Sequence, residues 1–106
     1  MKDIKTALIT GSNRGLGFEL LKSLSSEGYN IIACTRSKNS DFTKEIEKIS
    51  KTNNNKIYNI NFDLSDLDET QNQLSKFLNN YEQSIDVLIN NAGVLKNSLM
   101  LMTPIK

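Results

Sequence analysis

The chain has 106 residues, which is a suitable length for one domain with a hydrophobic core, and we expect no second domain. Its 13 basic and 12 acidic residues leave a formal net charge of +1, so no strong field favours binding to nucleic acid or to a membrane surface. We expect a cytoplasmic chain, because no apolar stretch approaches the roughly 20 residues that span a bilayer, no secretory leader follows Met1, and a single cysteine forms no intrachain disulfide.

The first predicted elements are a strand, a glycine-rich turn and a helix. Residues 5–10 form an apolar run that is too short for a helix and is typical of a buried strand. A helix with one apolar face follows, marked by leucines at helical spacing: Leu16, Leu20, Leu21 and Leu24. Between strand and helix lie three glycines with the spacing G-x-x-x-G-x-G, namely Gly11, Gly15 and Gly17.

The glycine-rich turn has two interpretations. Glycines adopt backbone angles that other residues avoid, and they let a ligand approach the main chain, while a helix start attracts phosphate; a pyrophosphate therefore fits this turn. The alternative is a tight connection that binds nothing. A nucleotide triphosphatase is disfavoured, because Gly15, Leu16 and Gly17 stand where its phosphate loop needs a glycine, a lysine and a hydroxyl residue.

The middle of the chain predicts two more strands around a second helix. A glycine at position 28 suits a helix end, and residues 30–35 then read as a buried strand that contains Cys34, a small buried side chain rather than a reactive thiol. Residues 41–51 predict a helix with an apolar face, which the polar run 52–55 ends. Residues 57–62 predict a third strand, less uniformly apolar and therefore suited to a sheet edge.

A third helix and a fourth strand complete the pattern. Ser65 or Asp66 can cap the helix, whose apolar stripe is Leu67, Thr70, Leu74, Phe77, Leu78 and Tyr81. Residues 86–90 predict the strand. Strands that alternate with helices of this length indicate an α/β fold with a parallel sheet and helices on both faces.

Four segments, in this order and spacing, carry a family resemblance: Thr10-Gly-Ser-Asn-Arg-Gly-Leu-Gly17, Cys34-Thr-Arg-Ser37, Asp63-Leu64 and Asn90-Asn-Ala-Gly93. They resemble the N-terminal half of the short-chain dehydrogenase/reductase family over essentially the whole chain. The resemblance implies a Rossmann-type open parallel sheet with strand order 3-2-1-4, truncated after the fourth strand. Residues 1–106 would then be a partial dinucleotide-binding domain, and residues 97–104 look like the entry to the family's next long helix.

The resemblance also implies which residues contact the cofactor. The pyrophosphate turn would comprise Gly11, Ser12, Asn13, Gly15, Leu16 and Gly17. Asp63 and Leu64 match the pair that meets the adenine, although Asp63 alone also suits the flank of a helix. Asn90, Ala92 and Gly93 would lie near the ribose on the nicotinamide side, with Asn90 also bracing neighbouring strands.

Charge after the second strand favours NADP(H) over NAD(H). A carboxylate there would accept hydrogen bonds from a free ribose 2′-hydroxyl and repel a 2′-phosphate, but Arg36 and Ser37 occupy this region and no acid precedes Asp41. The guanidinium of Arg36 offers a fixed fork of donors to a phosphate. Arg14 stands where NADP-preferring members of the family often carry a second basic residue. For either arginine taken alone, a solvated surface position is an equal alternative.

The proton-transfer residues of the family are absent from this sequence. Members of the family transfer a hydride between nicotinamide and a carbonyl or secondary alcohol, with a Tyr-x-x-x-Lys pair that handles the proton. The fourth residue after Tyr29, Tyr58 and Tyr81 is alanine, phenylalanine and isoleucine, respectively, and the chain has no histidine and no cluster that suits a catalytic metal. By resemblance we therefore expect an NADP-dependent oxidoreductase, and we expect this chain alone to be inactive.

Two organisations remain open. In the first, Met1 is a natural start and the chain is the cofactor-binding part of an NADP-dependent reductase, truncated or completed by further sequence beyond Lys106. In the second, it is a non-catalytic dinucleotide-binding module, or a subunit that associates through the exposed edge of its fourth strand with another polypeptide. The unadjusted apolar run of that strand, residues 87–89, favours the first.

Overall fold

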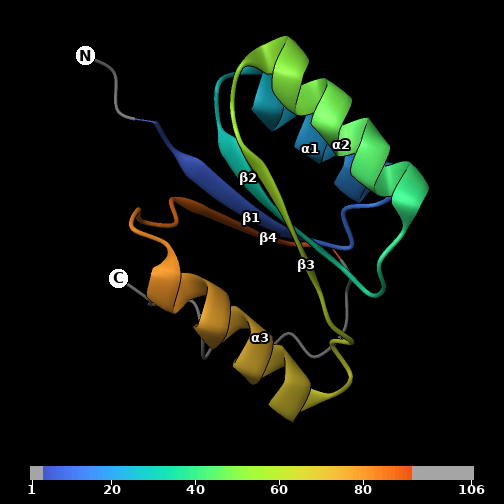
Figure 1. Ribbon diagram of the computed structural model, residues 1–106, viewed down its shortest axis with the longest axis vertical. Coiled ribbons are helices and arrows are strands. Elements are labelled where there is room, and N and C mark those ends of the chain that lie inside the picture. The colour runs from blue at the N-terminus through green and yellow to red at the C-terminus, as the bar shows by residue number, and fades with distance from the viewer. Residues whose placement is uncertain (1–3, 92–106) are drawn as a thin grey trace.

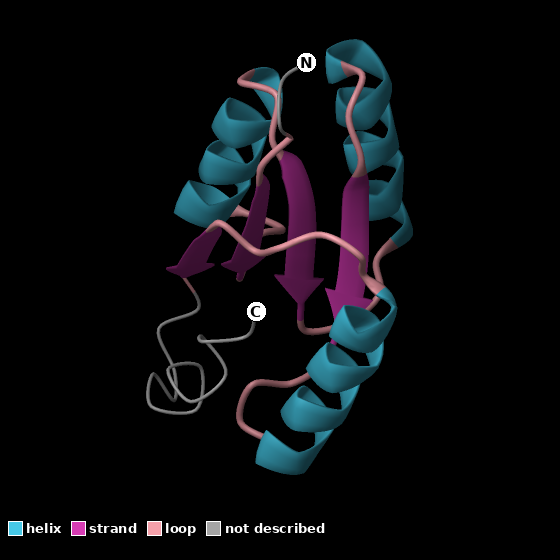
Figure 2. Ribbon diagram, turned by 90° about the vertical axis from the view of Figure 1, so that its left-hand side faces the viewer, coloured by secondary structure: helices cyan, strands magenta, loops and turns pink. Residues whose placement is uncertain are grey.

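A four-stranded parallel sheet lies between two layers of helices in the computed structural model, which describes residues 4–91 (Figures 1 and 2). Its elements are β1 (Thr6–Thr10), α1 (Gly15–Ser26), β2 (Asn30–Thr35), α2 (Ser40–Asn53), β3 (Ile57–Asn61), α3 (Leu67–Asn80) and β4 (Val87–Asn90). The strand order is β3-β2-β1-β4, so the predicted Rossmann-type α/β fold and its order are confirmed.

The order of the strands reverses at β1, which has β2 on one side and β4 on the other. Thr10 at the end of β1 is level with Cys34 of β2 and with Asn90 of β4. The carboxyl ends of these strands therefore reach the same edge of the sheet. In an open parallel sheet, this reversal is the place where ligands bind.

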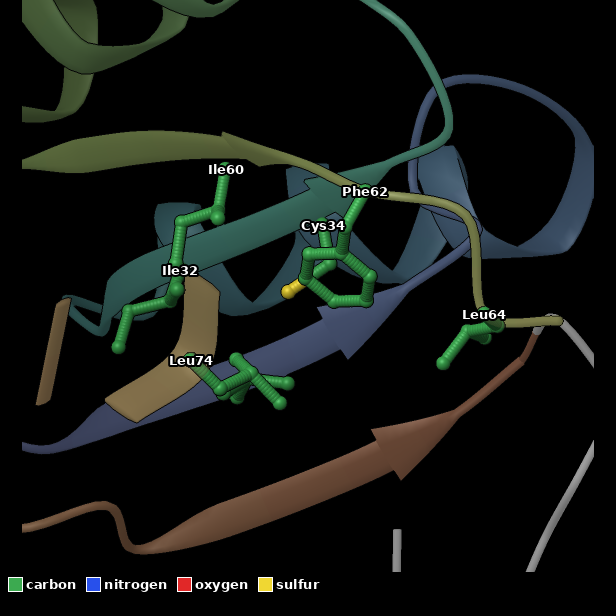
Figure 3. Packing of buried hydrophobic residues seen from close by; sticks show 7 residues of the cluster. Ile32, Cys34, Ile60, Phe62, Leu64 and Leu74 are labelled. Atoms are coloured by element: carbon green, nitrogen blue, oxygen red, sulfur yellow. The ribbon is translucent and has the colours of Figure 1, made fainter. Parts of the chain in front are cut away.

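Alternating side chains of the strands fill two cores, one on each face. Ala7 and Ile9 of β1 belong to the core beneath α1 and α2, together with Leu21, Ile31, Ala33, Phe42 and Ile46. On the other face, Leu74 of α3 packs with Leu8, Ile32, Cys34, Ile60, Phe62 and Leu64 (Figure 3). Figure 1 shows the same division, with α1 and α2 on one side of the sheet and α3 on the other. The central strands β1 and β2 are buried along their whole length.

The ends of the helices follow from local side-chain chemistry. The side chain of Asn39 accepts a hydrogen bond of 2.9 Å from the main-chain nitrogen of Phe42, so α2 begins at Ser40, slightly earlier than predicted. Asp66 is the cap of α3, one of the two candidates, and accepts 3.0 Å from the nitrogen of Glu69. Asn54 ends α2 in the left-handed region at φ 57°, and Gly28 follows α1 at φ 99°, as the polar run and the glycine predict.

The prediction that Leu16 and Leu67 lie on the buried faces of their helices is wrong. Leu16 is 66% exposed and Leu67 is 48% exposed, although helical spacing placed both against the core. Both lie in the first turn of their helices, with Leu67 the first residue of α3. Neither side chain belongs to the buried clusters on the two faces of the sheet. The helical period identifies a face, but it does not reveal where along the helix the sheet beneath it ends.

Within residues 4–91 the outer strands are β3 and β4, as the order 3-2-1-4 predicts. Val87, Leu88 and Ile89 are half-buried, in contrast to the full burial of β1. The expected entry to a next helix at residues 97–104 lies outside the described residues. Within residues 4–91, no helix has the length and apolar character needed to cross a membrane.

Candidate functional site

A pocket of about 750 Å³ opens at the carboxyl ends of the strands, on the edge where the strand order reverses. It gathers eight of the predicted site residues: Gly11, Asn13, Arg14, Gly15, Leu16, Arg36, Asp63 and Leu64. Thr10, Cys34, Thr35, Phe62, Ser65 and Asn91 complete the lining. Four segments that are distant in sequence thus meet at one cavity, and they are the segments that carried the family resemblance. Ala92 and Gly93 lie outside the described residues.

The glycines of the first turn have different structural reasons. Gly11 and Gly15 lie in the left-handed region at φ 61° and 59°, which strains a residue with a Cβ. A Cβ on Gly15 would nevertheless meet nothing within 4 Å. A Cβ on Gly17 would lie 2.1 Å from the main-chain oxygen of Gly11, so α1 can approach the turn only because position 17 is glycine. Glycine at positions 11 and 15 therefore permits the left-handed backbone of the turn, and glycine at position 17 permits the close packing of α1 against it.

Ser12 supports this turn from behind. It is fully buried, and its main-chain nitrogen and its hydroxyl both donate to the main-chain oxygen of Cys34, each at 3.4 Å. These bonds connect the turn to the end of β2. Ser12 does not line the pocket, so in the described structure its side chain acts as a support for the loop.

The start of α1 differs from the starts of the other two helices. Arg14 precedes α1 in an extended conformation, and in the described residues no side chain caps this helix and no acid lies in its first turn. In contrast, Asn39 and Asp66 cap α2 and α3, and acids lie in the first turn of both. The first-turn N–H groups of α1 and its positive dipole end are therefore available to an anion at the pocket.

Arg36 and Asp63 form an ion pair between the ends of β2 and β3. Nη2 of Arg36 donates to Oδ2 of Asp63 at 3.4 Å. The other carboxylate oxygen, Oδ1, accepts from the main-chain nitrogen of Ser65 at 3.0 Å and from its hydroxyl at 2.7 Å. These bonds from Ser65, with a smaller contribution from Arg36, hold the pKa of Asp63 below its usual value. The pocket therefore has an ionised carboxylate beside a guanidinium.

The end of β4 is tied to β1 and to the glycine turn by amide side chains. The hydroxyl of Thr10 donates 2.9 Å to Oδ1 of Asn90, which confirms Asn90 as a brace between strands. Nδ2 of Asn91 donates a hydrogen bond of 3.1 Å to the main-chain oxygen of Gly11. A Cβ on Gly17 would lie 2.7 Å from the same nitrogen. Thr10 and Asn91 are not among the residues predicted to bind the cofactor, although both belong to the segments that carry the family resemblance and both line the pocket.

The structure also describes the contacts of Leu64, Ser37 and Cys34. Leu64 lines the pocket but is also part of the core beneath α3. Ser37 is exposed, and its main-chain oxygen accepts 3.5 Å from the hydroxyl of Thr35. Burial raises the pKa of the Cys34 thiol to about 12, which agrees with a small buried side chain rather than a reactive nucleophile.

Catalytic chemistry is not evident in the described part of the chain. Residues 4–91 contain no group of three His, Cys, Asp or Glu side chains that could hold a metal ion. The hydroxyl of Tyr81 is 2.6 Å from the hydroxyl of Thr6, and Tyr58 packs against Phe77 and Tyr81. These tyrosines lie on the α3 side of the sheet, and neither lines the pocket at the strand ends.

Comparison with known families gives a clear result. Residues 5–104 match the family model described as short chain dehydrogenase. The chain belongs to this family. Short-chain dehydrogenases are oxidoreductases whose Rossmann fold binds a nicotinamide dinucleotide. The match includes all the elements that surround the pocket.

Individual relatives agree with this family. Salutaridine reductase from Papaver somniferum is 37% identical over 93 residues, which cover 85% of this chain and 29% of the reductase. An alcohol dehydrogenase from Thermococcus sibiricus, complexed with 5-hydroxy-NADP, has the same fold with a TM-score of 0.71 and 24% identity, over 81% of this chain and 36% of its own. A 3-oxoacyl-[acyl-carrier protein] reductase from Brucella melitensis, in complex with NAD, has a TM-score of 0.72 and 24% identity, over 88% and 35%. The chain thus spans about a third of the length of these proteins.

The pocket residues fit a dinucleotide on their own chemistry. Gly11 and Gly15 line the cavity without a Cβ, and the uncapped start of α1 offers N–H donors to a pyrophosphate. Two arginines, Arg14 and Arg36, line the same cavity and supply positive charge. An apolar and a carboxylate side chain, Leu64 and Asp63, suit the face and the amino group of a base.

Proposed function

We propose that residues 1–106 form the cofactor-binding part of an NADP(H)-dependent short-chain reductase. The observation that carries this proposal is the pocket at the strand ends, where the glycine turn and the uncapped start of α1 meet Arg36 and Asp63. On this proposal, the chain is a partial dinucleotide-binding domain, with its sheet continued by sequence that other members of the family carry.

Each side of the pocket receives one part of the cofactor. The turn at Gly11 and Gly15 and the first N–H groups of α1 bind the pyrophosphate, and Asn13 and Leu16 border it. Asp63 and Leu64 receive the adenine at the end of β3. Asn90, oriented through its bond to β1, borders the ribose on the nicotinamide side, and the family resemblance assigns Ala92 and Gly93, which lie outside the described residues, to the same ribose.

The preference for NADP(H) rests on charge. Arg14 and Arg36 both line the pocket, and Arg36 directly follows the last residue of β2, where a carboxylate would select NAD(H). The fold alone does not decide, because proteins of this fold have been solved with 5-hydroxy-NADP and with NAD. Arg36 is therefore the residue that we assign to the 2′-phosphate, and Ser37 is its neighbour on the same loop.

The reaction of the completed protein is a hydride transfer between the cofactor and a carbonyl or secondary alcohol. When bound, the dinucleotide supplies the hydride chemistry, and the residues of this chain bind and orient it. The Tyr-x-x-x-Lys pair is absent from the 106 residues, so we propose that this chain alone is inactive. A cytoplasmic location is also proposed, which the neutral, buried thiol of Cys34 suits. We further propose the half-buried strand β4 as the surface through which this chain associates with another polypeptide.

A titration of the 106-residue chain with NADPH and NADH tests the proposal. Tryptophan is absent, so nucleotide fluorescence and thermal unfolding are suitable signals. We expect saturable binding of both, tighter for NADPH, with an increase in the unfolding temperature. Arg36→Glu should weaken NADPH binding about ten-fold or more, because hydrogen bonds between charged groups contribute about 1.5–3 kcal/mol, and it should change NADH binding much less.

Lys48→Glu is the matched control, because Lys48 is exposed on α2, outside the pocket, and the change in charge is the same. Equal losses of NADPH and NADH binding in Arg36→Glu would contradict the 2′-phosphate assignment. A folded chain that binds neither nucleotide would contradict the proposed function. Turnover of a carbonyl substrate by the chain with NADPH would contradict its proposed inactivity.

A further inference from the structure

Arg36 and Asp63 connect two strand ends in the lining of the proposed cofactor pocket. Both residues line the cavity, and their side chains meet at 3.4 Å between Nη2 and Oδ2. Arg36 stands directly after β2, and Asp63 stands two residues after β3, on the neighbouring strand. The side chain of Arg36 is 82% exposed and that of Asp63 is 37% exposed, so the pair is reachable from solvent.

Asp63 is the fixed member of this pair. Its Oδ1 accepts hydrogen bonds from the main-chain nitrogen and from the hydroxyl of Ser65. Its main-chain oxygen accepts from the nitrogen of Asp66 at 2.9 Å and from the hydroxyl of Thr70, a fully buried residue, at 3.1 Å. Only Oδ2 faces the guanidinium. A change of partner within the pair therefore requires Arg36 to move and leaves the turn around Asp63 intact.

We propose that Asp63 competes with the cofactor's 2′-phosphate for Arg36, so that NADP(H) binding exchanges one anionic partner of this guanidinium for another. This inference rests on the proposed function. Asp63 is then a specificity-determining residue that lowers the preference for a 2′-phosphate, while Arg36 creates that preference.

The energies of the two partners allow the exchange. Exposed ion pairs contribute little to stability, because water screens the charges and both side chains lose freedom. A phosphate dianion offers more charge and accepts two parallel hydrogen bonds from one guanidinium. The phosphate therefore displaces the carboxylate, but the energy of the broken pair is subtracted from its affinity.

The test uses 2′,5′-ADP and 5′-AMP, which differ by the 2′-phosphate, in calorimetric titrations of the 106-residue chain. Asp63→Asn removes the charge and keeps an oxygen for Ser65, so the turn should persist. We expect the ratio of the two affinities, 2′,5′-ADP over 5′-AMP, to rise about two- to five-fold, the range that corresponds to a surface ion pair. The ratio is the informative quantity because it cancels any change in adenine binding.

Two controls isolate the exchange. Asp68→Asn removes the same charge from an exposed position on α3 that does not line the pocket, and it should leave the ratio unchanged. In an Arg36→Gln background, Asp63→Asn should also leave the ratio unchanged, because the residue for which the two anions compete is gone. Should Asp63→Asn fail to fold by circular dichroism, Asp63→Ser provides a second uncharged variant with an oxygen near Ser65.

Three results would overturn the inference. They are an unchanged or lower ratio in Asp63→Asn, an equal rise in Asp68→Asn, and an equal rise without Arg36, which would indicate direct repulsion between Asp63 and the phosphate. Failure of the proposed function has a different signature, because the folded wild-type chain would then bind neither nucleotide.

Discussion

Nδ2 of Asn91 donates a hydrogen bond of 3.1 Å to the main-chain oxygen of Gly11, a residue 80 positions earlier in the chain. This bond connects the end of β4 to the glycine turn, so the two most distant parts of the candidate site hold each other in place. Gly11 has a positive φ, and its carbonyl also borders Gly17. The conformation of the turn thus depends on β4 being paired with β1.

Asn91→Asp should therefore loosen the turn. The substitution removes the N–H donor and places a carboxylate against a carbonyl oxygen, and we expect a loss of about 1–3 kcal/mol in the free energy of unfolding together with weaker nucleotide binding. Denaturant titration and nucleotide fluorescence measure the two effects. Asn80→Asp is the control, because its exposed amide also donates to a carbonyl but lies on α3. Equal effects of both substitutions would contradict a specific role of Asn91.

The two glycines at the start of α1 should respond differently to alanine. Gly17→Ala places a Cβ 2.1 Å from the oxygen of Gly11, and main-chain atoms cannot yield easily, so we expect a loss of about 3 kcal/mol or more. Gly15→Ala meets open space and has only the cost of a left-handed backbone, about 1–2 kcal/mol. Denaturant unfolding of the two variants ranks them. A larger loss for Gly15→Ala would indicate that backbone conformation, rather than the approach of α1, controls the turn.

Cys34 should be inert in the folded chain. The thiol is buried in the core beneath α3, and its pKa is raised to about 12 (Figure 3). At pH 8, a disulfide reagent should modify it quickly in denaturant and many-fold more slowly in native buffer, at a rate limited by opening of the structure. Rapid labelling of the folded chain would contradict this burial.

The raised pKa of Cys34 should lower the free energy of unfolding at alkaline pH. A folded-state pKa above that of the unfolded chain means that the contribution of Cys34 is complete below about pH 9 and decreases as the pH rises toward 12. Over this window, the free energy of unfolding should fall faster in the wild type than in Cys34→Ala, by up to about 1.4 kcal/mol per pH unit. Parallel denaturant titrations at several pH values measure the difference, and parallel slopes would contradict the raised pKa.

Tyr81 should contribute to stability through its hydroxyl. This hydroxyl lies 2.6 Å from that of Thr6 at the start of β1 and links α3 to the sheet. Tyr81→Phe should cost about 0.5–1.5 kcal/mol, and a cycle with Thr6→Val should show that the two losses are coupled. Additive losses would mean that the contact does not persist in solution.

The order and type of the elements could be predicted from the sequence because they depend on local chemistry. Buried strands appear as continuous apolar runs such as residues 30–35, and Gly28, Asn54 and Asp66 mark helix ends through their own backbone and side-chain preferences. The glycine spacing and the segment 90–93 likewise identified the family, since each motif is contiguous. These predictions involve contacts only a few residues apart.

Contacts between distant segments needed the tertiary structure. No periodicity could show that Leu16 and Leu67 lie outside the two buried clusters, or that Asn91 reaches Gly11. From the sequence, Arg36 is expected to bind the 2′-phosphate and Asp63 the adenine. Only the adjacent ends of β2 and β3 show that Nη2 of Arg36 and Oδ2 of Asp63 lie 3.4 Å apart. Local propensity determines which residues form helices and strands. The contacts between distant side chains depend on strand order and register, which arise from the packing of the whole sheet.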